Sequence, residues 1–91
     1  RLPYTFHKLL YYDEMWRGLF LIIRRIRDLR EDHDYTQEYV ASYLGMKQSQ
    51  YSRYERGLRD TPTDVLIALV KLYNVSADYI LGISDNSTSY K

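Results

Sequence analysis

Apolar residues recur with a helical period over much of the chain. One stripe, with members three and four positions apart, comprises Leu19, Ile22, Ile23, Ile26 and Leu29. This spacing predicts a helix with one buried side, capped by Asp13 and ending near Glu31. Gly18 weakens its first part by about 1 kcal/mol relative to alanine, which allows a break there.

Residues 36–55 have the pattern of two short helices joined at a glycine. Thr36 is suited to capping the first helix, and Tyr35 and Val40 are spaced as a hydrophobic staple around it. Gly45 stands where the first helix must stop, because glycine adopts the left-handed conformation without steric cost. The inward positions of the two helices are Val40, Ala41, Leu44, Tyr51 and Tyr54. This arrangement predicts a helix-turn-helix.

Two further helices are expected after residue 60. The first has Thr61 as its cap and Pro62 in its first position, and it ends at Asn74. Its inward residues are Val65, Ala68, Leu69 and Leu72. Ser76 would cap a short last helix that Gly82 ends. We therefore predict an all-α fold of five helices.

The chain divides into three parts on this pattern. Residues 1–13 are too apolar for a flexible tail, and we expect an arm or short helix that covers a groove in its own subunit or in a partner. Residues 14–83 would form the domain, and the polar residues 84–91 would be frayed. The chain does not begin with methionine, so Met15 is an alternative start that would make residues 1–14 non-native.

Composition narrows the classes of function. The chain has 91 residues, no cysteine and a net charge of +1, which excludes disulfides, thiol catalysis and thiolate metal sites. The short apolar run 19–23 argues against a signal peptide. Residues 1–13 are too short and too polar in their aromatics to span a bilayer. Basic residues nevertheless cluster in residues 47–59, with four against one acid, whereas residues 31–38 hold four acids and no Lys or Arg.

The helix-turn-helix residues resemble the phage Cro and lambda-repressor-like (Xre-type) regulators. The resemblance covers roughly residues 20–83 and rests on Gln37, Ala41, Gly45, Tyr51 and Tyr54, with residues 53–57 and 73–82. The tyrosines depart from the usual aliphatic residues, as Lys47 departs from the usual Ser or Thr cap. The resemblance implies a five-helix DNA-binding domain of a cytoplasmic transcriptional regulator, which we expect to be a repressor.

The same resemblance implies which side chains contact an operator. The residues expected to read bases from the 48–56 helix, inserted in the major groove, are Gln48, Ser49, Gln50, Ser52 and Arg53. Those expected to contact phosphates are Thr36, Gln37, Lys47, Arg56 and Arg59. One such helix covers only a few base pairs, so a homodimer is expected. Its surface is left open between residues 75–83 and the N-terminal arm.

Several alternatives remain open at this level. The same fold could serve as a protein-interaction adaptor or an antitoxin-type partner-binding protein. Arg24, Arg25 and Arg27 fit a solvated helix face better than further phosphate contacts, and Tyr39 and Tyr43 could send hydroxyls to phosphate. An enzyme is the weakest alternative, because His7 and His33 lack a catalytic arrangement around them. Asp32 and Asp34 flank His33, but so short a polar turn rarely binds a metal. No cofactor and no small-molecule effector is expected.

Overall fold

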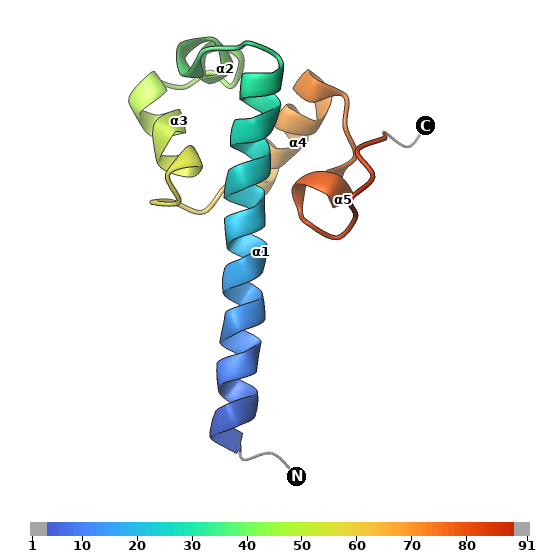
Figure 1. Cartoon of the computed structure of the whole chain (residues 1–91). Helices are drawn as coiled ribbons and strands as arrows, with labels where there is room; N and C mark the ends of the chain where they lie inside the picture. The colour runs from blue at the N-terminus through green and yellow to red at the C-terminus, as the bar shows by residue number, and fades with distance from the viewer. Residues whose placement is uncertain (1–3, 89–91) are drawn as a thin grey trace.

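Five helices form the part of the chain between residues 4 and 88, and the first extends well beyond the others (Figure 1). The computed structural model describes the backbone of these residues and the side chains of residues 18–88. The helices are α1 (Tyr4–Asp32), α2 (Gln37–Tyr43), α3 (Gln48–Glu55), α4 (Thr63–Tyr73) and α5 (Ala77–Ile80). Within this part, the β-type pairing is an isolated bridge between Val75 and Thr88. The predicted all-α fold is confirmed.

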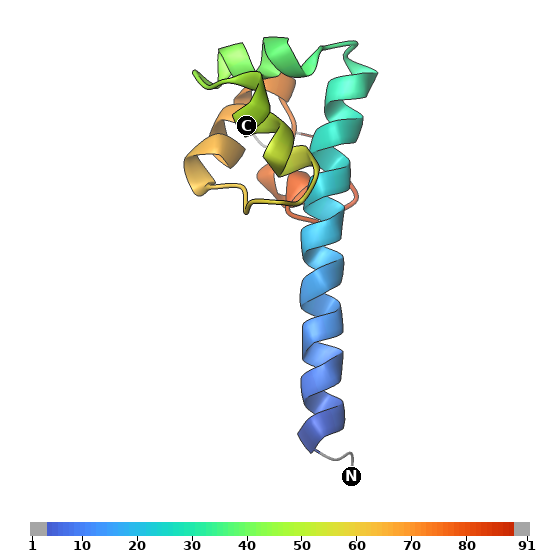
Figure 2. The same cartoon turned by 90° about the vertical axis from the view of Figure 1, so that its left-hand side faces the viewer.

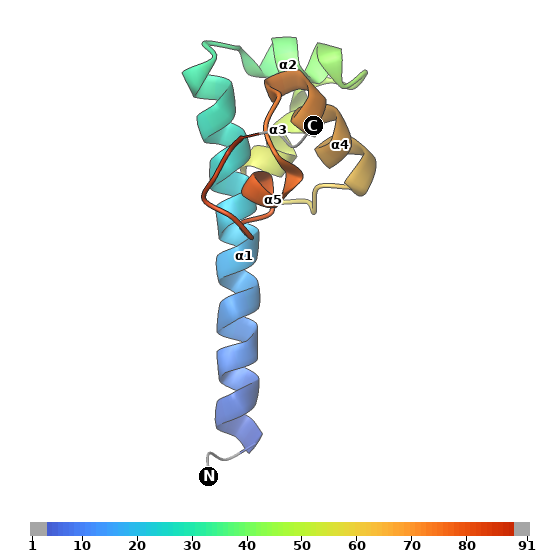
Figure 3. The same cartoon turned by 90° about the vertical axis from the view of Figure 1, so that its right-hand side faces the viewer.

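Helix α1 is longer than the sequence predicted. It begins at Tyr4 and passes without a break through Asp13 and Gly18, so the predicted start at Asp13 is wrong. A single glycine costs too little to end a helix, and no proline lies between residues 4 and 32. The first half projects away from the domain in all three views and does not fold back over its own subunit (Figures 1–3). Residues 1–3 of the predicted arm lie outside the described residues.

The core lies between the second half of α1 and the other four helices. Its buried apolar residues are Ile26, Leu29, Val40, Ala41, Tyr51, Tyr54, Val65, Leu69, Tyr73, Val75 and Ile80. The predicted stripe of α1 is therefore fully buried only at its C-terminal end. Leu19, Ile22 and Ile23 are half-buried, because α1 leaves the domain in this region.

Most of the predicted helix boundaries are confirmed by their local geometry. The hydroxyl of Thr36 accepts a hydrogen bond from the backbone N–H of Tyr39 at 3.0 Å, and Ser76 caps α5 in the same way. Gly45 and Asn74 adopt left-handed conformations with φ of 72° and 51°. Helix α4 begins later than expected. Pro62 is its cap, with extended backbone at ψ 157°, so the predicted cap at Thr61 is wrong by one residue.

The segment after α5 is bound to the domain, contrary to the expectation that residues 84–91 are frayed. The backbone carbonyl of Ser87 accepts from the N–H of Ser76 at 3.1 Å, and the hydroxyl of Ser76 donates to the carbonyl of Asn86 at 3.2 Å. This segment runs back past α5 (Figure 3). The expectation fails for residues 84–88, while 89–91 lie outside the described part.

Arg25 holds this segment against α1. Its guanidinium donates to the backbone carbonyl of Tyr79. It also donates to the carbonyl of Ser84 and to the carboxylate of Asp85, at 2.8 Å in both cases. It also stacks on the Tyr79 ring, 4.2 Å from the centroid. The placement of Arg25 on a solvated face is therefore wrong. Its helical position turns it toward α5, where backbone carbonyls and the Asp85 carboxylate compensate for its desolvation.

Candidate nucleic-acid interface

The turn between α2 and α3 fixes the direction in which α3 leaves. The N–H of Gly45 donates to the carbonyl of Ser42 at 3.1 Å, and that of Met46 donates to Ala41 at 3.0 Å. These bonds satisfy carbonyls at the end of α2, as in a left-handed helix cap. Helix α3 is then anchored on its inner side by Tyr51 and Tyr54, whose rings meet edge to face at 6.4 Å.

The outer side of α3 is not covered by another element of the described chain, as the views from two sides show (Figures 1 and 2). Gln48, Ser49 and Arg53 are exposed, and Gln50 and Ser52 are half-buried. All five residues predicted to read bases thus lie on one short helix at the surface of the domain. The small serines leave room for a second molecule to approach the backbone, and the longer glutamine and arginine side chains can reach toward it.

The residues predicted to contact phosphates lie at both ends of α3 and at the start of α2. Lys47 precedes α3, and Arg56 and Arg59 follow it, all three exposed. Thr36 is exposed before α2. Gln37 is different, because it is half-buried and its side-chain amide is hydrogen-bonded to other protein side chains.

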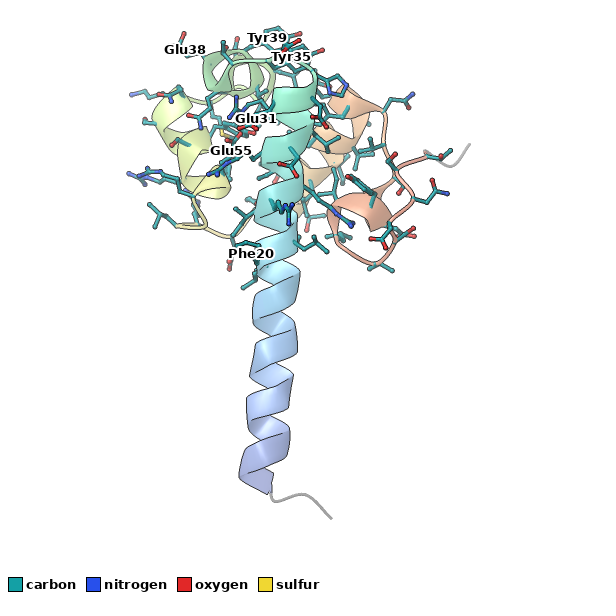
Figure 4. All side chains as sticks on the ribbon, in the orientation of Figure 1. Phe20, Glu31, Tyr35, Glu38, Tyr39 and Glu55 are labelled. Carbon is teal, nitrogen blue, oxygen red and sulfur yellow. The ribbon has the colours of Figure 1, made fainter. Side chains whose placement is uncertain are left out.

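A chain of polar side chains connects the outer face of α3 to the core. The Gln48 amide donates to the Gln37 carbonyl oxygen at 2.7 Å, and the Gln37 amide donates to the Glu55 carboxylate at 3.1 Å. Arg30 of α1 holds both oxygens of that carboxylate, at 2.7 and 3.0 Å. Figure 4 shows Glu55 directed toward α1 from the end of α3. The base-reading candidate Gln48 is thus linked to a buried ion pair.

The charge of Glu55 is retained in spite of its burial. Its side chain is fully enclosed, and burial alone would raise the pKa of the carboxyl. The hydrogen bonds from Arg30 and Gln37, with the charge of Arg30, outweigh burial and lower the pKa below its ordinary value of 4.5. The hydrogen bond to Glu55 in turn raises the pKa of Arg30. Burial, and then the neighbouring carboxylate, raise the pKa of the Tyr51 hydroxyl.

Glu55 and Arg30 were not predicted from the sequence as members of this site. A signal was present, because Glu55 lies four residues after Tyr51 and so shares its inward side. An acidic residue on a buried helix side requires a cationic partner. The sequence does not indicate which of the arginines in α1 supplies that partner. Arg24 instead pairs with Asp28 at 3.6 Å, and Arg27 lies at the edge of the site, 3.9 Å from Glu55.

A separate aromatic group is formed by His33, Tyr35, Tyr39 and Tyr73. Tyr39 and Tyr43 are about half-exposed. The Tyr39 ring packs on Tyr35 at 4.5 Å, and His33 lies 5.0 Å from the ring of Tyr73. Figure 4 shows Tyr35 and Tyr39 together at the end of the domain opposite the projecting helix. Among the described side chains, no group of three or more metal-ligating residues is found.

The helices were also compared with the requirements for a membrane span. Within the part of the chain that the structure describes, no helix combines the length and the apolar character that crossing a bilayer requires.

Comparison with known proteins places this geometry in a family. A helix-turn-helix family model (HTH_3) matches residues 26–80. The chain is 43% identical over 63 residues to the HTH-type transcriptional regulator YobD of Bacillus subtilis, which covers 69% of this chain and 56% of that protein. It is 44% identical over 59 residues to the HTH-type transcriptional regulator ImmR of the same organism, covering 65% of this chain and 46% of ImmR.

A solved structure is similar in fold as well. The P22 c2 repressor protein, in a crystal structure with a synthetic operator, superposes with a TM-score of 0.59 at 27% identity, covering 65% of this chain and 89% of that one. The chain spans about half the length of the curated relatives that it matches. The family match covers more than half of the chain and includes α2, α3 and the last part of α1, which together build the site. The chain therefore belongs to the Xre-type, lambda-repressor-like family of helix-turn-helix proteins.

Proposed function

We propose that this protein is a sequence-specific transcriptional repressor that inserts α3 into the major groove of a double-stranded operator. The observation that carries the proposal is the exposed Gln–Ser–Arg side of α3, held in place from behind by a buried ion pair. It is supported by the relatives, which are named transcriptional regulators, and by the operator in the crystal structure of the P22 c2 repressor. A repressor of this kind would act in the cytoplasm.

The hydrogen-bond chain determines what Gln48 offers to DNA. Because one amide hydrogen of Gln48 is donated to Gln37, its carbonyl oxygen and its second amide hydrogen are left for a base. One acceptor beside one donor matches the N6 and N7 edge of adenine. Arg53, which is exposed on the same side of α3, matches the two acceptors of guanine. Each such pair provides about 1–3 kcal/mol of discrimination. Ser49, Gln50 and Ser52 complete the surface that reads bases.

The flanking residues would position α3 on the backbone of the duplex. Lys47, Arg56 and Arg59 supply positive charge at both ends of the helix, and Thr36 and the second amide hydrogen of Gln37 supply neutral donors. Contacts of this kind fix register without selecting sequence. They also make affinity fall as salt rises, because bound cations are released from the DNA.

The protein would bind its operator as a homodimer. One α3 reads only a few base pairs, and two copies that read half-sites roughly 34–36 Å apart extend the recognised sequence. Two-fold symmetry in the protein then predicts a palindromic operator.

Selection from a random duplex library tests the proposal. The intact chain should enrich one palindromic site, and affinity for that site should fall steeply with salt. Arg53→Ala should lose preference at one base position of each half-site. Gln37→Ala should weaken binding to all duplexes and also relax preference at the base that Gln48 reads, because it removes the bond that orients Gln48. Lys71→Ala removes one exposed positive charge from α4, away from the site, and serves as the matched control.

Two results would count against the proposal. If Arg53→Ala and Gln37→Ala kept the preferred site and affinity of the unchanged chain, α3 would not be the reading element. If binding to generic duplex did not weaken as salt rises, the electrostatic contacts would be absent and an adaptor function would be favoured.

A further inference from the structure

The projecting half of α1 needs a packing partner. Helix α1 has 29 residues, which corresponds to a length of about 43 Å, and the part before Gly18 extends beyond the domain (Figures 1 and 3). A helical segment of this length is only marginally stable in water unless it packs against something, because isolated helices shorter than about 12–15 residues are marginal. The fourteen residues 4–17 nevertheless include eight aromatic or aliphatic ones: Tyr4, Phe6, Leu9, Leu10, Tyr11, Tyr12, Met15 and Trp16.

An apolar groove begins where α1 leaves the domain. It has a volume of about 290 Å³. Its apolar lining comes from Leu19, Phe20, Ile22, Ile23 and Leu66, and the charged residues Arg56, Arg59 and Asp60 line it as well. A second hollow continues it along the flank of α1, sharing Phe20 and Ile23 and reaching Glu31. Phe20 stands at the junction with 65% of its surface exposed, and Figure 4 shows it at the lower edge of the domain. Phe20 adjoins the apolar lining of the groove, and adjoining exposed apolar side chains, unlike single ones, mark a contact surface.

We propose that two copies of this chain associate through α1 in antiparallel orientation, each laying its projecting half in the groove of the other. This inference rests on the proposed function, for which it names the surface that joins the two subunits. A two-fold axis across α1, near the point where it leaves the domain, places the apolar-rich residues 4–17 of each copy against the groove of the other. A parallel pairing of the projecting halves would leave Phe20 and the groove open to water, so it buries less apolar surface.

Charge does not oppose this arrangement. The projecting half carries two cations and two anions, and so does the flank of α1 that would receive it; the residues are Lys8, Arg17, Asp13 and Glu14, then Arg24, Arg27, Asp28 and Glu31. Neither strip has a net charge. The groove itself adds Arg56, Arg59 and Asp60, a net charge of +1 that faces a neutral projecting half, so like-charge repulsion is not built in. The contact is isologous, as expected for a closed dimer.

Sedimentation equilibrium of the intact chain tests the surface. We expect a dimer at micromolar concentration for the unchanged chain and a monomer for Phe20→Glu. Ile83→Glu is the matched control, because Ile83 is 72% exposed near α5, and it should stay dimeric. Both sites are exposed, so circular dichroism should show unchanged folding of the domain. A dimeric Phe20→Glu, a monomeric Ile83→Glu or a monomeric unchanged chain would each overturn the proposal.

Orientation is tested by cross-linking, since the chain contains no cysteine. In Tyr4→Cys, an antiparallel pair keeps the two thiols more than about 30 Å apart, so oxidation should give no covalent dimer. A covalent dimer would require Cα atoms within about 7 Å and would overturn the antiparallel arrangement. Binding of generic duplex by Phe20→Glu separates this inference from the proposed function. If Phe20→Glu is a monomer that still binds duplex in a salt-dependent manner, both the dimer surface and the proposed function are supported. If the unchanged chain forms a dimer that depends on Phe20 but binds no DNA, only the proposed function is rejected.

Discussion

The buried ion pair between α1 and α3 predicts that Glu55→Gln destabilises the protein strongly. Removing one charge of a buried pair leaves the other uncompensated, at a cost of about 3–5 kcal/mol. The Arg30 side chain is 15% exposed, so water can solvate part of its charge, and we expect about 3 kcal/mol, at the lower end of that range. With about 4–8 °C per kcal/mol for a domain of this size, the midpoint of thermal unfolding should fall by about 12–24 °C.

Thermal and urea unfolding, followed by circular dichroism, measure this loss. A double-mutant cycle with Arg30→Met separates the pair from its surroundings, because removing both charges should cost less than the sum of the single changes. Arg24→Gln is the control: it breaks a pair with Asp28 in which both side chains are at least half exposed, and it should cost less than about 0.5 kcal/mol. A loss for Glu55→Gln no larger than that of the control would refute the reasoning.

The same pair predicts how stability depends on pH. In the folded protein the pKa of Glu55 lies below its ordinary value of 4.5. Its contribution is therefore complete above that value and is lost as the pH falls through the lower pKa of the folded state. The free energy of unfolding should decline below about pH 4.5 in the unchanged chain. In Glu55→Gln this decline should be smaller, since the group that titrates is absent.

Three further substitutions test the glycine within α1, the glycine in the turn after α2, and the arginine that holds the C-terminal segment. Gly18→Ala should stabilise the domain by about 0.5–1 kcal/mol in urea unfolding, because a methyl group there meets no atom within 4 Å and the residue is helical. Gly45→Ala, where φ is +72° and space is also open, should cost about 1–2 kcal/mol from backbone strain alone. Arg25→Met should speed hydrogen exchange of the Ser76 amide, which donates to residue 87; unchanged exchange would show that Arg25 does not hold the segment.

The sequence predicted the parts of the fold that depend on local chemistry. Thr36, Gly45 and Asn74 end or begin helices for reasons contained in a few neighbouring residues, and all three act as expected. Tyr51 and Tyr54 were placed inward by their spacing and are buried. The family was identified from the same residues. The exposure of α3 followed, since the side opposite two buried tyrosines must face away from the core.

What the sequence did not predict depends on contacts between distant residues. Arg25 lies among charged residues that suggest a solvated helix face. Only its contact with a segment about 60 positions later explains its burial. The pairing of Arg30 with Glu55 spans 25 positions in the same way. The continuity of α1 was missed for another reason. Gly18 weakens the helix locally, but the helix on either side of it outweighs that cost.

These long-range contacts explain how so short a helix can present a fixed surface. Helix α3 has eight residues, and its cap Lys47 makes no side-chain cap bond, so it is too short to be stable alone. Its position must come from its inward residues, which are Tyr51, Tyr54 and Glu55. The outward residues contribute little to that position, although Gln48 is oriented through the same network. Stability therefore resides on the inner side of α3, and under the proposed function the outward side could change its preferred operator without loss of the fold.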